Sequence, residues 1–304
     1  MSIAVSEFSQ GALRLRLVGP PPDLQPFVSG YYRTEVASGR VIEDWLPPEE
    51  ANLRCGEGEL YRAAIGDDAL VDVPGDVVSG PTDRVTRLQI GGGKFWGIGL
   101  TPAGWARFFR FPANSMANRF ADISATEADE SIRDLLETLR KDGDDIDASV
   151  ALINSTLRGL PDKSKPGEAG IRKAHLAIVA DDAVSVYEVA DALGMNLRTF
   201  ERFCKRHLGF APGALLRRQR FLRSLGKYML DPSMRWINSL DTHYWDQAHF
   251  IREFRAVMNM TPSEYAALPH PIVAAAVAVT NAGSGVAMQA LYHPDQLRES
   301  ETGL

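Results

Sequence analysis

The chain has 304 residues, 45% of them hydrophobic and 24% charged, with a formal net charge of −6, which is typical of an ordinary globular protein with two domains. Its longest apolar run, Ile272 to Val279, is far too short to span a bilayer, and the first residues lack the basic end and apolar run of a signal peptide. Two isolated cysteines, Cys55 and Cys204, belong to no CxxC pair, so we expect a protein of the reducing cytoplasm with no membrane association.

From Leu13 to Leu100 the sequence consists of short β-rich segments separated by glycine and proline. The segments are LRLRLV, FVSGYYRTEV, VIEDWL, ALVDV, VTRLQI and FWGIGL. This spacing favours an all-β sandwich or barrel over an α/β fold. Five aromatic side chains could line an apolar effector pocket, although core packing is their commoner role: Tyr31, Tyr32, Trp45, Trp96 and Trp105.

The β-rich region lacks the residues that catalysis or metal binding needs. All six histidines lie after residue 174, so the region offers neither a histidine base nor histidine metal ligands. The lone Cys55 is more typical of a core or surface residue than of a nucleophile. The run Gly91 to Lys94 resembles a phosphate loop but is followed by Phe95 and a β-like segment, and the acidic run 142–147 has Ile146 at a calcium-ligand position. We therefore expect no catalytic residue, no metal and no cofactor.

Helical periodicity replaces the β pattern after residue 100. Thr101 and Pro102 form a good helix start, and helices are predicted over 125–141 and 144–157. The apolar stripe Ile132, Leu135, Leu136 and Leu139 suggests a homodimer interface, with core packing as the alternative. The polar Pro- and Gly-rich stretch from 159 to 170 then marks a linker. The predicted organisation is a sensor or dimerisation domain at 1–160, a linker at 161–169, a DNA-binding domain at 170–268 and a tail at 269–304.

The stretch from Ser185 to Pro212 has the pattern of a helix-turn-helix. Ser185 and Glu188 have capping-box spacing, and Gly194 suits the end of a short amphipathic helix. Asn196 can cap a second helix whose apolar stripe packs on the first. The outward face of this second helix carries charged and polar side chains: Arg198, Thr199, Glu201, Arg202, Lys205 and Arg206.

A repeat at a distance of 50 residues supports this interpretation. It aligns Asp246 with Asn196, Phe250 with Phe200 and Arg252 with Arg202, and residues 214–230 between the copies form one amphipathic helix. The charged residues are also unevenly distributed between the two parts of the chain. Residues 1–169 carry 18 Lys and Arg against 26 Asp and Glu, whereas residues 170–268 carry 14 against 10, so the positive charge lies where phosphate contacts would be needed.

The last third of the chain resembles the AraC/XylS-type transcriptional regulators. The resemblance rests on EVADALGMNLRTFERFCKRHLGFAP, on the connecting RRQRFLRSL and on DQAHFIREFRAVMNMTPSEY. It implies a seven-helix domain whose two recognition helices enter successive major grooves, preceded by a cupin-like jelly roll that senses an effector or dimerises. The fold class is then α+β, with a β-rich domain and trailing helices followed by an all-α double helix-turn-helix domain. In the second unit, His243 stands where the family has glycine, and Asn238 and Ser239 replace small apolar residues.

The expected function is that of a sequence-specific transcriptional regulator that binds double-stranded DNA, carries out no chemistry and responds to a small-molecule effector as a homodimer. We expect DNA contacts from Arg198, Thr199, Glu201, Arg202 and Lys205 in the first unit and from Gln247, His249 and Arg252 in the second. The positions of the second helix that match the family's pattern are Ala248, Ile251 and Arg252, and Gln247 and His249 flank them. One alternative is a regulator whose β domain only dimerises. The other is an enzyme or repair protein that carries this module. For the tail, one helix packed on the body is predicted, without a function.

Overall fold

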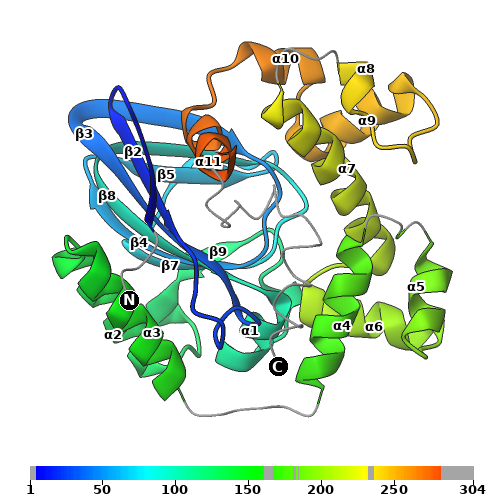
Figure 1. The fold of residues 1–304 in the computed structure, drawn as a ribbon, viewed down its shortest axis with the longest axis horizontal. Coiled ribbons are helices and arrows are strands. Elements are labelled where there is room, and N and C mark those ends of the chain that lie inside the picture. The colour runs from blue at the N-terminus through cyan, green and yellow to red at the C-terminus, as the bar shows by residue number, and fades with distance from the viewer. Residues whose placement is uncertain (1–4, 161–166, 181–182, 184, 232–235, 282–304) are drawn as a thin grey trace.

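The computed structural model describes residues 5–160, 167–180, 183, 185–231 and 236–281. An antiparallel β-rich part occupies the N-terminal half and an all-helical part follows it, as Figure 1 shows, so the predicted α+β class is confirmed. No helix among the described residues combines the length and the apolar character needed to cross a membrane. The predicted linker at 161–169 falls largely outside the described residues.

The sheet is built around two long strands, β3 and β8, which pair antiparallel along most of their length. The order of the strands is β1-β2-β3-β8-β4-β7-β9, and β5 pairs with the first part of β8 and with β6. The strands are β1 (Val5–Gln10), β2 (Leu13–Val18), β3 (Val28–Leu46), β4 (Asn52–Gly58), β5 (Tyr61–Ile65), β6 (Val71–Asp72), β7 (Asp76–Ser79), β8 (Thr86–Leu100) and β9 (Phe120–Asp122).

Four of the short segments predicted from the sequence thus merge into two strands. A register shift between Val36 and Val41 lets β3 continue where a break was predicted. In β8 the glycine run lies inside the strand, because other backbone approaches it closely. A Cβ on Gly93 would stand 2.3 Å from the carbonyl oxygen of Glu57. The run resembling a phosphate loop is therefore the part of β8 that neighbouring backbone approaches closely, next to the register shift of β3.

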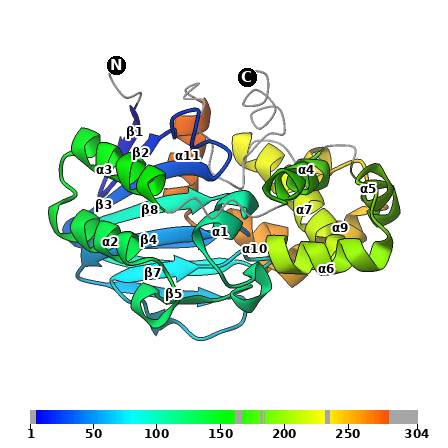
Figure 2. The same ribbon diagram turned by 90° about the horizontal axis from the view of Figure 1, so that it is seen from below.

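Helices α1 to α3 cover the outer face of this sheet (Figure 2). They are α1 (Pro102–Phe108), α2 (Glu130–Asp142) and α3 (Ile146–Gly159), with short 3-10 turns η1 (Ala113–Ser115) and η2 (Ile123–Ala125) between α1 and α2. The predicted start of α1 is confirmed, since the Gly104 amide donates to the Thr101 hydroxyl at 3.0 Å. The acidic run forms the start of α3: Asp145 caps the helix, and Asp144 forms ion pairs with Arg33 and Lys94.

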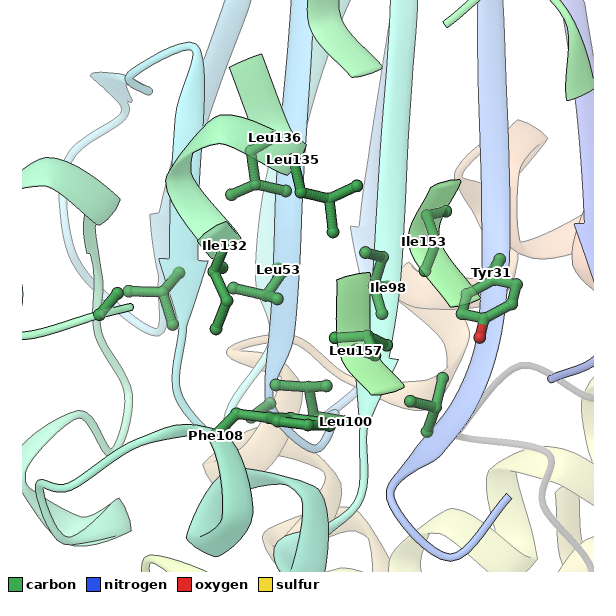
Figure 3. Packing of buried hydrophobic residues seen from close by; sticks show 14 of the residues in the cluster. Tyr31, Leu53, Ile98, Leu100, Phe108, Ile132, Leu135, Leu136, Ile153 and Leu157 are labelled. Atoms are coloured by element: carbon green, nitrogen blue, oxygen red, sulfur yellow. The ribbon is translucent and has the colours of Figure 1, made fainter. Parts of the chain in front are cut away.

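The apolar stripe of α2 belongs to the core. Ile132, Leu135, Leu136 and Leu139 are each at most 2% exposed and belong to one core cluster with the sheet. Figure 3 shows the first three packed toward Leu53, Ile98 and Leu100. Side chains buried in this way within one chain cannot form a contact between two chains. The prediction of a homodimer interface at these residues is therefore wrong, and the alternative of core packing holds.

The helical part contains the predicted connector and both helix pairs. Its elements are α4 (Glu168–Val179), α5 (Val186–Ala192), α6 (Leu197–Leu208), α7 (Pro212–Leu230), α8 (Trp236–Ser239), α9 (Gln247–Met258), α10 (Pro262–Ala267) and α11 (Pro271–Asn281). Between residues 168 and 267 the described chain thus forms the seven helices that the resemblance implies. The last helix, α11, returns to the β-rich part and packs on β1, β2 and β3. It is the helix predicted for the tail.

Candidate nucleic-acid interface

The first helix pair, α5 and α6, is held as the sequence predicts. Ser185 accepts a hydrogen bond from the Glu188 amide at 3.4 Å, and Asn196 accepts one from the Thr199 amide at 2.9 Å. Gly194 has a φ of +66°, a left-handed conformation that favours glycine in the turn. Phe200 and Cys204 are fully buried beneath α6, and burial raises the pKa of the Cys204 thiol to about 12. The outward face of α6 is therefore fixed by packing on its other side.

That outward face presents the predicted residues to solvent. Arg198 and Arg202 are exposed, and neither makes an ion pair within the described part of the chain. Glu201 and Lys205 form an exposed pair at 2.7 Å, and the hydrogen bond from Lys205 lowers the pKa of Glu201. Thr199 is half-buried at the start of the helix. Glu201 therefore pairs with Lys205 in this structure.

The turn of the second unit is built without glycine. The buried carboxylate of Asp241 accepts hydrogen bonds from the His243 amide at 3.0 Å and the His243 ring at 2.6 Å, and from Arg223 at 2.5 Å. Although burial opposes it, these donors lower the pKa of Asp241. Ser239 is buried and bonds back to the Trp236 carbonyl at 2.9 Å. His243 therefore replaces the family's glycine without a left-handed backbone, because a side chain now organises the turn.

Recognition helix α9 is locked to α7 by a buried network. Glu253 is 9% exposed and accepts from the Tyr244 hydroxyl at 2.5 Å and from Arg220, which also lies over the Tyr244 ring. The His249 ring packs on Tyr244 with centroids 5.3 Å apart, and its Nε2 lies 3.9 Å from Glu253. His249 thus faces this network, while Gln247 and Arg252 are exposed.

Arg252 is exposed and has no carboxylate partner among the described residues. One further residue was missed. Trp245 is 92% exposed, immediately before Asp246, which caps α9 through the His249 amide at 2.7 Å. Tryptophan combines a large apolar ring with one N–H donor, so at the start of α9 it is a candidate for contact with DNA. Its position between the turn and the N-cap is the signal that could have identified it.

Helix α7 sets the distance between the two units. It has 19 residues and therefore spans about 28 Å. Figure 1 shows α6 near one end of it and α9 near the other. Successive major grooves on one side of duplex DNA are about 34 Å apart, which is the spacing that two helices on such a connector can reach.

The helical part is docked on the β-rich part. Arg218 of α7, 5% exposed, donates to the carbonyl oxygen of Thr82 at 3.1 Å. His175 of α4 lies 2.5 Å from the Glu50 carboxylate, and the Val85 amide donates to the Val257 carbonyl at 2.8 Å. A groove of about 620 Å³ separates the outward face of α6 from η1, whose Asn114 forms part of its wall. The β-rich part therefore fixes where the two recognition helices stand.

A second candidate site lies inside the β-rich part. A cavity of about 100 Å³ is walled mainly by apolar side chains of the sheet and of α11. Three of the five aromatics singled out from the sequence line it, namely Tyr31, Tyr32 and Trp96, whereas Trp105 belongs to the core outside the sheet. Cys55 is 1% exposed and burial raises the pKa of its thiol, which is the opposite of what a nucleophile requires.

The sequence matches two families of domains. Residues 189–267 match a helix-turn-helix domain, and residues 16–122 match a domain of unknown function (DUF6597). No curated protein sequence matches the chain. Both recognition helices lie within the helix-turn-helix match.

Solved structures show only distant similarity. ToxT from Vibrio cholerae is 10% identical with a TM-score of 0.41, over 78% of this chain and 96% of ToxT. The same protein with a bound unsaturated fatty acid is 9% identical with a TM-score of 0.41, over 75% of this chain and 94% of ToxT. The AraC-like transcriptional activator CuxR is 12% identical with a TM-score of 0.29, over 70% of this chain and 81% of CuxR. What bears on function is therefore the matched helix-turn-helix region.

Proposed function

Because this chain belongs to the AraC/XylS-type DNA-binding transcriptional regulators, with the helix-turn-helix domain at residues 189–267, we propose that it reads specific duplex DNA through two successive major grooves. In this proposal α6 and α9 are the recognition helices, and α7 holds them about one helical turn of DNA apart. The protein then performs no chemistry of its own.

The observation that carries this proposal is the pair of unpartnered arginines on α6. Arg198 and Arg202 lie one helical turn apart on the exposed face, and no carboxylate among the described residues neutralises them. Arginine can donate two hydrogen bonds to the O6 and N7 atoms of guanine. On α9 the exposed candidates for DNA contact are Gln247 and Arg252. We assign Arg252 mainly to general affinity, and His249 to holding the helix rather than to reading bases.

We propose that the β-rich part senses a small-molecule effector. The cavity within the sheet supports this, because it borders both the sheet and a helix of the C-terminal region. The alternative of a β domain that only dimerises gains no support from α2, whose stripe is buried. A homodimer stays a prediction and needs a different surface. The enzyme alternative is disfavoured by a β-rich region with no histidine and a buried Cys55.

The test uses the full-length protein and its own promoter DNA. Binding to this DNA should be tighter than to random duplexes of equal length, and both affinities should fall steeply as salt rises. Equal affinity for the two kinds of duplex at every salt concentration would overturn the regulator function. The apparent spacing of the two protected half-sites should be about one helical turn.

A further inference from the structure

Helix α11 continues the chain beyond the helix-turn-helix region and closes the open side of the sheet (Figure 1). Its inner face consists of small and branched apolar residues that are at most 8% exposed: Ile272, Val273, Ala275, Ala276, Val277 and Val279. This face joins a cluster that contains strand residues such as Leu15 and helix residues such as Phe254. The helix therefore belongs to the β-rich part and to the second recognition unit at once.

A single carboxylate of the sheet holds the start of α11. Asp44 of β3 is fully buried, and one of its oxygens accepts from the amides of Ile272 at 2.8 Å and Val273 at 3.0 Å. These two amides have no partner within their own helix, so a residue more than 200 positions earlier caps it. An acidic group at this end is also favoured by the helix dipole.

His270 completes this contact. One ring nitrogen lies 3.1 Å from the Asp44 carboxylate and the other 2.7 Å from the Tyr265 carbonyl oxygen, and the ring stacks on Tyr265 with centroids 3.9 Å apart. Both partners are acceptors, so the ring donates to both only when it is doubly protonated. Tyr265 belongs to α10, the last helix of the second unit. The Asp44 and His270 pair therefore ties the sheet, α10 and α11 together.

The same helix forms one wall of the cavity. Ile272 and Ala276 face the aromatic and aliphatic side chains that line the sheet. At the polar edge, Arg54 donates to Tyr32, Ser79 and Glu49, so each of its three nitrogens already has a partner. Although burial opposes it, attraction to Glu49 raises the pKa of Arg54, so the pair is ionic and carries no net charge. Thr34 also lines the cavity, and its hydroxyl makes no hydrogen bond to another residue of the described part of the chain.

From these contacts we propose that α11 is the closing wall of a site for a small, uncharged, largely apolar molecule with one hydrogen-bonding group, such as a simple phenol. A cavity of this size is comparable with engineered apolar cavities that bind benzene. The bound molecule contacts Ile272 and Ala276 and stabilises α11 on the sheet. Because α11 follows α10 directly, this holds the second recognition unit in its docked position and lowers DNA affinity. The inference rests on the proposed DNA-binding function and adds the ligand class and the coupling element.

The ligand site is tested by measuring binding of p-cresol to variants with matched substitutions on the two faces of α11. Ala276 lines the cavity, whereas Ala274 is exposed on the same helix. We expect saturable binding of p-cresol to the full-length protein, weakened about tenfold by Ala276→Leu and unchanged by Ala274→Leu. Ile272→Ala enlarges the site and should favour 4-propylphenol over p-cresol. No binding of p-cresol, or equal effects of the two leucine substitutions, would overturn the site.

The coupling arm uses Asp44→Asn, with His270→Gln as the second variant if the first does not fold. Asp44→Asn should speed hydrogen exchange at the amides of residues 272 and 273 by about tenfold or more, because their hydrogen bonds to a charged group are lost. His270→Gln leaves the Asp44 carboxylate in place and removes the ring that contacts its other oxygen, so the same amides should exchange faster by a smaller factor. In the wild type, saturating p-cresol should weaken promoter binding about fivefold or more, and the variants should abolish this effect and bind DNA more tightly.

Different results would refute the coupling through α11 and the DNA-binding function. If α11 loosens while promoter affinity and its response to p-cresol stay unchanged, the coupling through α11 is refuted and the regulator function stands. If the wild-type protein shows no preference for its promoter, the proposed function itself fails, whatever p-cresol does.

Discussion

Replacing Arg202 by alanine should relax base preference in one half-site and leave the fold intact. The side chain is exposed and makes no ion pair within the described chain, so the free energy of unfolding should change by less than about 0.5 kcal/mol. A bidentate contact between arginine and guanine contributes about 1–3 kcal/mol of discrimination. This corresponds to a loss of preference of about 5- to 150-fold at one base pair.

The assay is selection of binding sites from randomised duplexes with the full-length protein. Arg252→Ala, in the second unit, should mainly lower affinity for all sequences. Lys205→Ala should do the same while reducing the salt slope by about 1, because it removes a phosphate contact. Arg40→Ala serves as the control, since Arg40 is an exposed arginine in the β-rich part. Loss of base preference with Arg252→Ala but none with Arg202→Ala would reverse the division of roles between the two helices.

Three further changes test other parts of the structure. Leu135→Lys should unfold the protein rather than produce folded monomers, because the free energy of unfolding falls by about 2–5 kcal/mol or more. Glu137→Lys, on the exposed face of α2, should leave the protein folded. A folded, monomeric Leu135→Lys variant in calorimetry and sedimentation would contradict the core assignment. Trp245→Ala should weaken promoter binding without lowering the melting temperature, and an unchanged Kd would remove Trp245 from the interface. His175 lowers the pKa of Glu50 below 4.5 despite burial, so the stability that this carboxylate contributes is present above about pH 4.5 and is lost as pH falls through the lowered value. The difference in unfolding free energy between wild type and Glu50→Gln should therefore shrink in acid, and a constant difference in urea titrations would refute this.

Helix ends were predictable because their signals are local. Asn196 and Gly194 act within one or two residues of the turn that they form, and the structure has both in the expected roles. The stripe of α2 carried no such information. An apolar face is the same whether a sheet or a second chain covers it, and only the fold places Leu53 and Ile98 beneath Leu135.

Long-range partners explain the other differences. Glycines between two β segments suggested a break, whereas the approach of Glu57 to Gly93 makes them part of one strand. The pattern of α9 placed His249 among the base readers, yet its ring meets Tyr244 and Glu253. The side chain of His249 could lie on either side of α9, and residues distant in the sequence decide which side it occupies. The tail gave no sequence signal for its attachment, because its capping residue, Asp44, comes from β3.

The apolar cluster that runs from Leu15 through Phe254 to Val277 limits how this protein can be divided. A segment ending at residue 268 leaves out α11, and its helices α7 and α9 then expose side chains that the full chain buries. An exchange of the β-rich part at the predicted linker would likewise remove the strand residues that cover α11. Chimeras of this regulator should accordingly keep α11 together with the β-rich part that caps it. Evolution of a new effector response would then proceed through paired changes in the sheet and in the C-terminal helix, rather than by recombination of intact modules.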